Sequence, residues 1–404
     1  MVQYNYYHTF EEFITPTDVQ IAFYAVDFDL WFGAIHSFFD FRSVVPCSLY
    51  ATLLWCTKEN TRFSLRQFFI VPFLLIFVGS IIYFSCGSYH YLAKMANSSF
   101  IAFHNVISVW EIDFFRQNSF KEREQVDKIE YNNPTKNIVF IMDESVRGDH
   151  LSINGYHRKT TPFLDKIQQD GALINWGICS SAATNSINSN NLLLVGVNSF
   201  PDTAYHSLTK PTLFQYSKAM GYTNWYFDAQ KDIWWNGTRN DFNAIDIWKP
   251  MNVIRKNTDI PHYENDKMMA EQVNEIVSSS TGNFIWLTKR GVHHPYNDDF
   301  PNERPEWSPI MESNTIDITK QNQLNNSYDD AILYNFETFF KALFKDNIIP
   351  QNTIFVYTSD HGQTLSENGE NWTHSRVTKN EANVPLFIIG LKTSLHSMFQ
   401  FLKF

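Results

Sequence analysis

Short apolar runs alternate with helix-like stretches over the C-terminal two-thirds of the chain. The apolar runs are rich in β-branched and aromatic residues, which is typical of strands covered on both faces of a sheet. They predict strands over Asn137–Met142, Tyr222–Phe227, Asn283–Thr288, Thr353–Thr358 and Pro385–Ile389. Between them, the pattern predicts helices over Thr161–Gln169, Leu208–Met220, Lys267–Ser278 and Tyr328–Phe344. Strands that alternate with helices favour an α/β domain with a largely parallel sheet.

The first hundred residues have a different pattern. Phe68–Gly87 contains twenty consecutive uncharged residues, enough to cross the hydrocarbon core of a membrane as a helix. The alternative is a buried core helix, but soluble helices of that length seldom lack any charge. The apolar run Val44–Cys56 is too short for a standard span. The basic loop of Lys58, Arg62 and Arg66 just before Phe68 indicates that the chain after about residue 90 lies outside the cytoplasm.

From Ile101 the chain turns polar, and Phe114–Asp127 is compatible with an amphipathic segment near the membrane surface. Pro134 marks the start of the strand-and-helix pattern. We therefore divide the chain into a partial membrane-embedded helical region (1–100), an amphipathic connector (101–133) and a soluble domain (134–404).

The overall charge excludes one broad class of function. The formal net charge is −10 and the pI is about 5.7, with no basic patch. Nucleic-acid binding needs clustered Lys and Arg, so we expect no nucleic-acid partner. Three of the four cysteines fall in the apolar N-terminal part, which leaves only Cys179 in the polar part. The polar domain therefore has neither a disulfide framework nor a CxxC metal motif.

Candidate chemistry follows the predicted strands, where open α/β sheets place their active sites. Asp360 and His361 come directly after the strand Thr353–Thr358, and Gly362 allows an abrupt turn. Asp143 and Glu144 leave the first strand together, and two such carboxylates repel each other unless a cation lies beside them. Zinc accepts oxygen and nitrogen ligands in this arrangement. Taken singly, each pair is equally compatible with an ordinary turn or with an acidic turn paired to a basic residue.

A stretch rich in small and hydroxyl residues, Cys179–Ser186, precedes the apolar Leu192–Val195. Such a stretch can begin a helix whose backbone N–H groups face an anion while one hydroxyl points into the site. A neutral threonine hydroxyl is a poor nucleophile, but a neighbouring cation activates it. Helix capping and turn formation are the alternative roles of these residues.

Three loop histidines are candidates by position. His293 and His294 follow the strand Asn283–Thr288, and the proline after them fixes an extended backbone, so we expect only one of the two to enter the site. His374 follows Asp360 and His361 after a polar loop. Loop histidines are more often surface residues than ligands.

Taken together, these motifs resemble the membrane-bound phosphoethanolamine transferases of the alkaline phosphatase/sulfatase superfamily. The resemblance covers roughly residues 134–390 and rests on 142–167 (MDESVRGDHLSINGYHRKTTPFLDKI), Cys179–Ser186, 291–295 (GVHHP), 328–336 (YDDAILYNF) and 357–369 (YTSDHGQTLSENG). It implies an alkaline-phosphatase-like α/β/α sandwich with a zinc site, preceded by an N-terminal transmembrane region. It also implies a bacterial inner-membrane protein whose catalytic domain faces the periplasm. The activity implied is transfer of phosphoethanolamine from phosphatidylethanolamine to lipid A or the lipopolysaccharide core.

Residue by residue, the resemblance implies that Glu144, Asp360 and His361 are zinc ligands. It implies that Thr184 is both the fourth ligand and the nucleophile, and that His293 and His374 hold a second zinc or the substrate phosphate. This chain has one residue more than expected between Cys179 and the threonine, which leaves Ser181 and Ser186 as alternative nucleophiles.

Departures from the family keep other functions open. Sulfatases need the pattern Cys-x-Pro-x-Arg, which Cys179–Ala183 lacks. Relatives have several transmembrane helices, soluble-domain disulfides and a longer C-terminal part, so we expect the chain to be truncated at both ends. A phosphodiesterase, a phosphoglycerol transferase and an inactive, membrane-tethered binding relative remain the alternatives.

Overall fold

The computed structural model describes residues 123–127, 134–196, 206–207, 209–230, 243–255, 260–312, 317–369, 373–392 and 395. The predicted membrane helix Phe68–Gly87 and most of the predicted connector lie outside these residues. Among the described residues, no helix has the length and apolar character needed to span a membrane.

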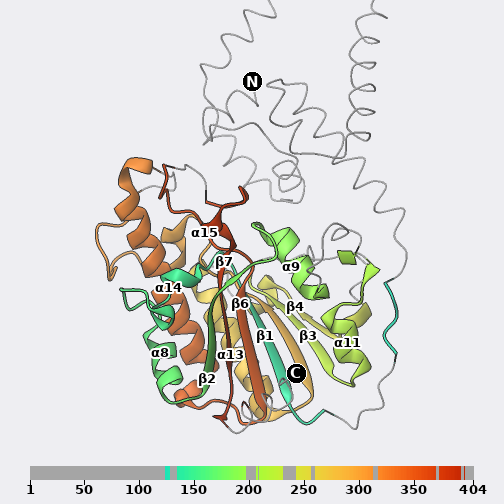
Figure 1. Ribbon diagram of the computed structural model, residues 1–404. Helices are drawn as coiled ribbons and strands as arrows, with labels where there is room; N and C mark the ends of the chain where they lie inside the picture. Colours follow the sequence, from blue (N-terminus) through green and yellow to red (C-terminus); the bar gives the residue numbers. More distant parts are fainter. Residues whose placement is uncertain are drawn as a thin grey trace, which may run out of the picture. The chain divides into compact units, whose positions relative to one another are not determined.

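A seven-stranded sheet in the order β2-β7-β6-β1-β5-β3-β4 forms the centre of the described part (Figure 1). Neighbouring strands from β6 through β1, β5 and β3 to β4 pair in parallel, whereas β7 is antiparallel to both of its neighbours. The strands are β1 (Asn137–Asp143), β2 (Leu173–Ser180), β3 (Thr223–Asp228), β4 (Ile247–Lys249), β5 (Asn283–Thr288), β6 (Thr353–Ser359) and β7 (Asn383–Ile389). The five predicted strands are confirmed, with β5 at its predicted bounds and the ends of the other four within two residues of the prediction.

The sequence pattern missed the two strands at the edges of the sheet. β2 carries alternately exposed side chains and a register shift between Asn175 and Gly177, so it contains no continuous apolar run. β4 is only three residues long. Edge strands are only partly covered, which removes the apolar signal that identifies central strands.

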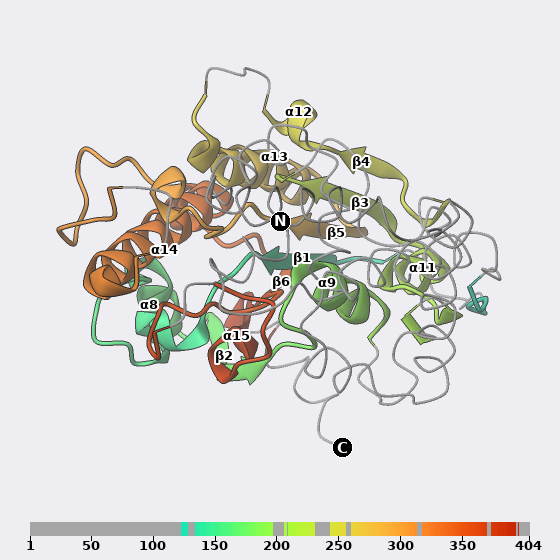
Figure 2. The same cartoon turned by 90° about the horizontal axis from the view of Figure 1, so that it is seen from above.

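Helices cover both faces of the sheet, which confirms the predicted α/β/α layering for the described part (Figure 2). One face packs against α8, α13 and α14, and the other against α9 and α11. The longer helices are α8 (Pro162–Gln169), α9 (Ser186–Val195), α11 (Leu213–Ala219), α13 (Asn265–Ser279) and α14 (Gln321–Leu343). The short elements are α12 (Met251–Ile254), α15 (Lys379–Ala382), η3 (Gly148–His150), η4 (Ser152–Asn154), η6 (His262–Glu264), η7 (Tyr296–Asp299), η8 (Ile318–Lys320) and η9 (Lys345–Asn347).

Two helix starts differ from the prediction for identifiable reasons. α11 begins at Leu213 because Thr212 and Gln215 form a reciprocal capping box directly after Pro211. α14 begins at Gln321, about two turns before the predicted start. Its first turns are polar and present mainly Leu324 to the core, so they lack an apolar period.

Alternating strand residues divide the core into two layers. Val139 and Ile141 of β1 pack with the α8, α13 and α14 layer, whereas Phe140 packs with the α9 and α11 layer. In the larger layer, the rings of Tyr357 and Phe387 stack with their centroids 4.3 Å apart. This contact joins the antiparallel strand β7 to β6, whose end carries Asp360 and His361.

Replacing Phe387 with alanine should therefore destabilise the sheet at the β6–β7 junction. Phe387 is fully buried, and removing a buried phenylalanine ring costs about 3–5 kcal/mol. Thermal unfolding should show a clearly lower midpoint than in Ile348→Ala, whose side chain is 65% exposed. Equal midpoints for the two variants would contradict the assigned packing.

Candidate active site

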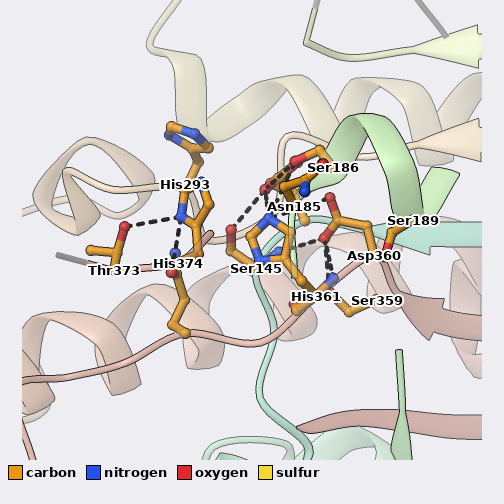
Figure 3. A network of polar contacts seen from close by, with 12 residues as sticks. Ser145, Asn185, Ser186, Ser189, His293, Ser359, Asp360, His361, Thr373 and His374 are labelled. Carbon is orange, nitrogen blue, oxygen red and sulfur yellow. Dashed lines mark hydrogen bonds and ion pairs between the residues drawn. The ribbon is translucent and has the colours of Figure 1, made fainter. Parts of the chain in front are cut away.

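The loops that follow the parallel strands bring the candidate residues together at one edge of the sheet. Glu144 follows β1, and Asp360 and His361 follow β6, the strand that pairs with β1. The two loops are joined directly, since Asp360 N–H donates to Asp143 O at 3.0 Å and Ser145 N–H donates to Asp360 Oδ1 at 3.0 Å. Figure 3 shows Asp360, His361, Ser145 and Ser186 converging on this point.

Glu144, Asp360 and His361 form a buried group with the geometry of a metal site. One ligand atom from each lies within 4.8 Å of the others, and none of the three residues is more than 2% exposed. His361 Nε2 is 3.3 Å from Glu144 Oε1 and 3.7 Å from Asp360 Oδ2. Asp360 Oδ2 is buried without a hydrogen-bond partner, which is costly for a carboxylate oxygen. A cation at this point would satisfy that oxygen, and the mixed oxygen and nitrogen donors suit zinc.

The electrostatics of the group also favour a cation. Burial, together with the charge of Glu144, raises the pKa of Asp360 to about 7. Burial alone would lower the pKa of His361, but Asp360 and Glu144 outweigh it and raise that pKa to about 9. Burial would raise the pKa of Glu144, but hydrogen bonding and attraction to His361 hold it well below its usual range. The three side chains thus retain a proton that a divalent ion would replace.

Within the hydroxyl-rich stretch Cys179–Ser186, the hydroxyl group that meets this cluster belongs to Ser186. Its Oγ lies 3.2 Å from His361 Nε2, 3.3 Å from Glu144 Oε1 and 3.2 Å from Glu144 Oε2. The Ser181 hydroxyl instead donates to the carbonyl of Ala183 at 2.6 Å. Within the described residues, the hydroxyl of Thr184 makes no hydrogen bond to Glu144, Asp360 or His361. Of the three hydroxyls that the sequence left open, that of Ser186 thus lies at the cluster, whereas the role of Thr184 stays a prediction.

The start of α9 explains why Ser186 lies there. Asn185 is the N-cap of α9, and its side chain accepts a hydrogen bond from Asn188 N–H at 3.0 Å. Ser186 is therefore the first helical residue. Ser189 contacts the preceding loop, since its hydroxyl donates to Ala183 O at 2.9 Å. The amino end of the ten-residue helix α9 carries a partial positive charge, which favours an anion or a negatively charged oxygen at Ser186.

His293 and His374 lie beside the cluster. The ring of His374 stacks on that of His361 with centroids 4.5 Å apart, and the His293 ring is 6.2 Å from that of His374. Nδ1 of His374 lies 2.9 Å from Thr373 Oγ1 and 3.3 Å from Gln363 Oε1. Burial, together with His361 and His293, holds the pKa of His374 well below its usual range, so its ring is neutral near pH 7. A neutral imidazole can bind a metal or accept a proton.

The sequence reasoning missed two residues that hold Glu144. Ser145, which has a positive φ of 63°, donates its hydroxyl to Glu144 Oε1 at 2.7 Å. Gln230 donates to Glu144 Oε2 at 3.1 Å. Gln230 lies two residues beyond the end of β3, and that position at the sheet edge was the available signal.

Comparison with known proteins shows the family of the chain. The family profile described as Sulfatase matches residues 136–397. The chain belongs to the sulfatase family. It is 24% identical over 232 residues to the Kdo(2)-lipid A phosphoethanolamine 7''-transferase of Escherichia coli (strain K12). The aligned region covers 57% of this chain and 39% of that protein. The chain thus spans less than half of that curated relative.

Two solved structures share the fold. The C-terminal periplasmic domain of EcEptC from Escherichia coli, in complex with Zn, aligns with a TM-score of 0.55 and 21% identity over 69% of this chain and 79% of that one. The integral membrane lipooligosaccharide phosphoethanolamine transferase A (EptA) from Neisseria meningitidis aligns with a TM-score of 0.68 and 18% identity over 97% of this chain and 75% of that one. The matches confirm the resemblance to phosphoethanolamine transferases of the alkaline phosphatase-like superfamily.

The pKa of His361 predicts how pH acts on the metal-free protein. This pKa is raised from 6.5 to about 9 on folding, so protonated His361 stabilises the folded state. That contribution is complete below pH 6.5 and is lost as the pH rises towards 9. The loss is on the order of 3 kcal/mol. In chelator-treated protein, the thermal unfolding midpoint should decrease as the pH is raised from 7 to 9.5. His361→Gln should remove most of that decrease. A wild-type profile that matches His361→Gln would contradict the assigned electrostatics.

Proposed function

We propose that this chain is a zinc-dependent transferase that moves phosphoethanolamine from phosphatidylethanolamine to a glycolipid, such as lipid A or the lipopolysaccharide core, through a covalent intermediate on Ser186. The observation that carries this proposal is the Ser186 hydroxyl, which lies within hydrogen-bond distance of both Glu144 and His361. A metal cluster with a hydroxyl at a helix start is suited to nucleophilic phosphoryl transfer. The printed names of the relatives give the group transferred and the class of acceptor.

Glu144, Asp360 and His361 would hold the zinc, with the Ser186 hydroxyl beside them. Zinc bound there would supply Lewis acidity, which lowers the pKa of a neighbouring hydroxyl and offsets charge on the phosphoryl oxygens. The side chains around the site keep these donors in place. Ser145 and Gln230 fix the two oxygens of Glu144, while Asp360 Oδ1 accepts N–H groups from Ser145 and His361.

In the first step, Ser186 Oγ attacks the phosphorus of phosphatidylethanolamine and the oxygen of diacylglycerol leaves. The proton of the Ser186 hydroxyl passes to a neighbouring neutral histidine, His293 or His374, which then delivers a proton to the departing oxygen. The partial positive charge at the amino end of α9 stabilises the negative charge on the phosphoryl oxygens during that attack.

In the second step, a phosphate or sugar hydroxyl of the acceptor attacks the phosphoserine diester and frees Ser186. His374 is suited to accept the proton of that hydroxyl, because its ring is neutral near pH 7 and stacks on His361. His293 is the second candidate, and either histidine would otherwise bind a second zinc or the phosphate.

The membrane assignment is also part of the proposal. Phe68–Gly87 would anchor the chain in the bacterial inner membrane, with the catalytic domain in the periplasm. Donor and acceptor are both lipids. Confining the site to the membrane surface raises the effective concentration of both.

Substituting the candidate nucleophiles one at a time should distinguish them. Ser186→Ala should lower transfer by at least about 10³-fold, because within 179–186 Ser186 supplies the hydroxyl that meets the proposed metal ligands. Thr184→Ala and Ser181→Ala are the matched controls and should retain most activity. Mass spectrometry of wild-type protein incubated with phosphatidylethanolamine should find the phosphoethanolamine adduct on Ser186. An adduct on Thr184 would support the assignment implied by the family instead.

The fate of labelled donor should separate transfer from hydrolysis. Membranes that contain the full chain, labelled phosphatidylethanolamine and lipid A should pass the label to the glycolipid, and chelation of zinc should abolish the transfer. Release of free phosphoethanolamine alone would identify a phosphodiesterase. Purified wild-type protein that takes up no stoichiometric zinc would favour the inactive binding relative.

A further inference from the structure

A second buried charged cluster adjoins the ligand loop and is centred on Lys289, the residue that follows β5. Lys289 is fully buried, and its ammonium group contacts the side chains of Asp143 and Asn335. Its Nζ lies 4.0 Å from Asp266 Oδ2. The rings of Phe339 and Phe336 lie over the same nitrogen, with centroids 4.4 and 5.3 Å away.

Such a site is costly to maintain. Transferring a lysine ammonium from water to a protein interior costs several kcal/mol, which its partners only partly offset. An apolar residue of similar size would fill the space among the α14 rings at no such cost. A buried lysine here therefore calls for a reason beyond packing, and its contacts lead directly to a metal ligand.

The first connection runs through Asp143. Oδ2 of Asp143 contacts Lys289 and also accepts a hydrogen bond from the Tyr357 hydroxyl at 2.6 Å. Its other oxygen, Oδ1, accepts the backbone N–H of Glu144 at 2.9 Å. The orientation of this carboxylate is thus fixed on one side by Lys289 and fixes the backbone of Glu144 on the other.

The second connection runs through the backbone of Lys289. Its carbonyl accepts a hydrogen bond from Gln230 Nε2 at 2.7 Å, and the same Nε2 donates to Glu144 Oε2 at 3.1 Å. The N–H of Lys289 donates to Met142 O at 2.9 Å. Both the backbone and the carboxylate of Glu144 are therefore held by groups that contact Lys289.

The same cluster fixes the loop that leads to His293. Asp266 accepts the N–H groups of Arg290 and Gly291 at 2.7 and 3.0 Å. Val292 N–H donates to Glu144 O at 3.0 Å. Gly291 has a φ of +64°, and a Cβ there would lie 2.5 Å from Asp143 Oδ1 and from Glu144 O. The β1 and β5 loops are thus packed too closely to shift independently.

We propose that Lys289 and Asp143 act as one buried ion pair that positions Glu144 for metal binding and sets its place relative to the His293 loop. Neither residue touches the metal or the substrate, so both are positioning residues. The inference rests on the proposed function, because it takes Glu144 to be a zinc ligand.

The test is a double-mutant cycle on the full chain, purified in detergent, with zinc affinity measured by chelator competition. The variants are Asp143→Asn, Lys289→Met and the combination of the two. Each single change should weaken zinc binding by about 10-fold or more, the usual effect of losing a group that orients a metal ligand. In the combined variant, the fold-decrease in zinc affinity should be clearly smaller than the product of the two single fold-decreases, because the two side chains act as a unit.

Arg158→Met is the matched control. It removes the cation beside Asp329, another fully buried carboxylate, 2.8 Å from Arg158 Nη1. This pair lies in the same domain and does not contact Glu144, so the change should lower the unfolding midpoint while leaving zinc affinity within about twofold of wild type. A purely structural role for Lys289 would give the same outcome for Lys289→Met, a lower midpoint with unchanged zinc affinity, and would overturn the inference.

Losses that simply multiply in the combined variant would also overturn it. If Lys289→Met does not fold, Asp143→Asn decides alone, because asparagine keeps the shape and the acceptor oxygen, and unchanged zinc affinity in that variant refutes the ion pair's role. Wild-type protein that binds no zinc refutes the proposed function as well as this inference. Zinc-binding wild type with unaltered variants refutes the inference only.

Discussion

The repulsion between Glu144 and Asp360 is the constraint on which the site depends. Both carboxylates are almost completely buried, and the only cationic group that the described residues bring within 4 Å of them is His361. In a low-dielectric interior, such a pair is stable only with a shared proton or a cation. Burial and the charge of Glu144 raise the pKa of Asp360, and attraction to both carboxylates raises the pKa of His361. Asp360 Oδ2 is left without a hydrogen-bond partner in the same group. The surrounding structure therefore has to hold the carboxylates of Glu144 and Asp360 together against their mutual repulsion.

The parallel sheet supplies the force that opposes the repulsion. β1 and β6 pair in parallel over their full lengths, which brings Asp143 opposite Ser359 and delivers the next residues of both strands to the same edge. Ser359 reinforces this junction, since its hydroxyl accepts Val146 N–H at 2.9 Å and contacts Asp143 O at 3.2 Å. The aromatic packing of β6 against α14 and β7 lies on the same strand. Core packing thus offsets the electrostatic cost at the edge of the sheet.

Much of this organisation was predictable from the sequence, for physical reasons. Central strands such as β1 and β6 are largely buried, so burial alone gave an apolar run with clear ends. The candidate ligands Glu144, Asp360 and His361 directly follow the ends of these two strands. The edge strands β2 and β4 gave no such run. Which hydroxyl reaches the candidate ligands depends on where α9 begins, and α9 opens with Ser186-Ile187-Asn188-Ser189, which has no apolar period. Spacing along the chain could not choose between Thr184 and Ser186, because that choice depends on Asn185 as the cap.

The position of Ser186 also depends on β2 and β7, the two strands that lie beyond β6 in the sheet. β2 leads into the hydroxyl stretch, and its partner β7 is the strand that breaks the parallel pattern. Past the end of β2, Ser181 N–H donates to Ala382 O at 2.8 Å, and Thr184 O accepts Ser375 N–H at 2.9 Å. Gly362 N–H donates to Glu381 O, so the residue next to His361 is joined to the same α15 segment. The loop 373–382 consequently connects the hydroxyl stretch to the ligand loop after β6. A shift of β7 would therefore act on both the hydroxyl stretch and the loop that carries Asp360 and His361.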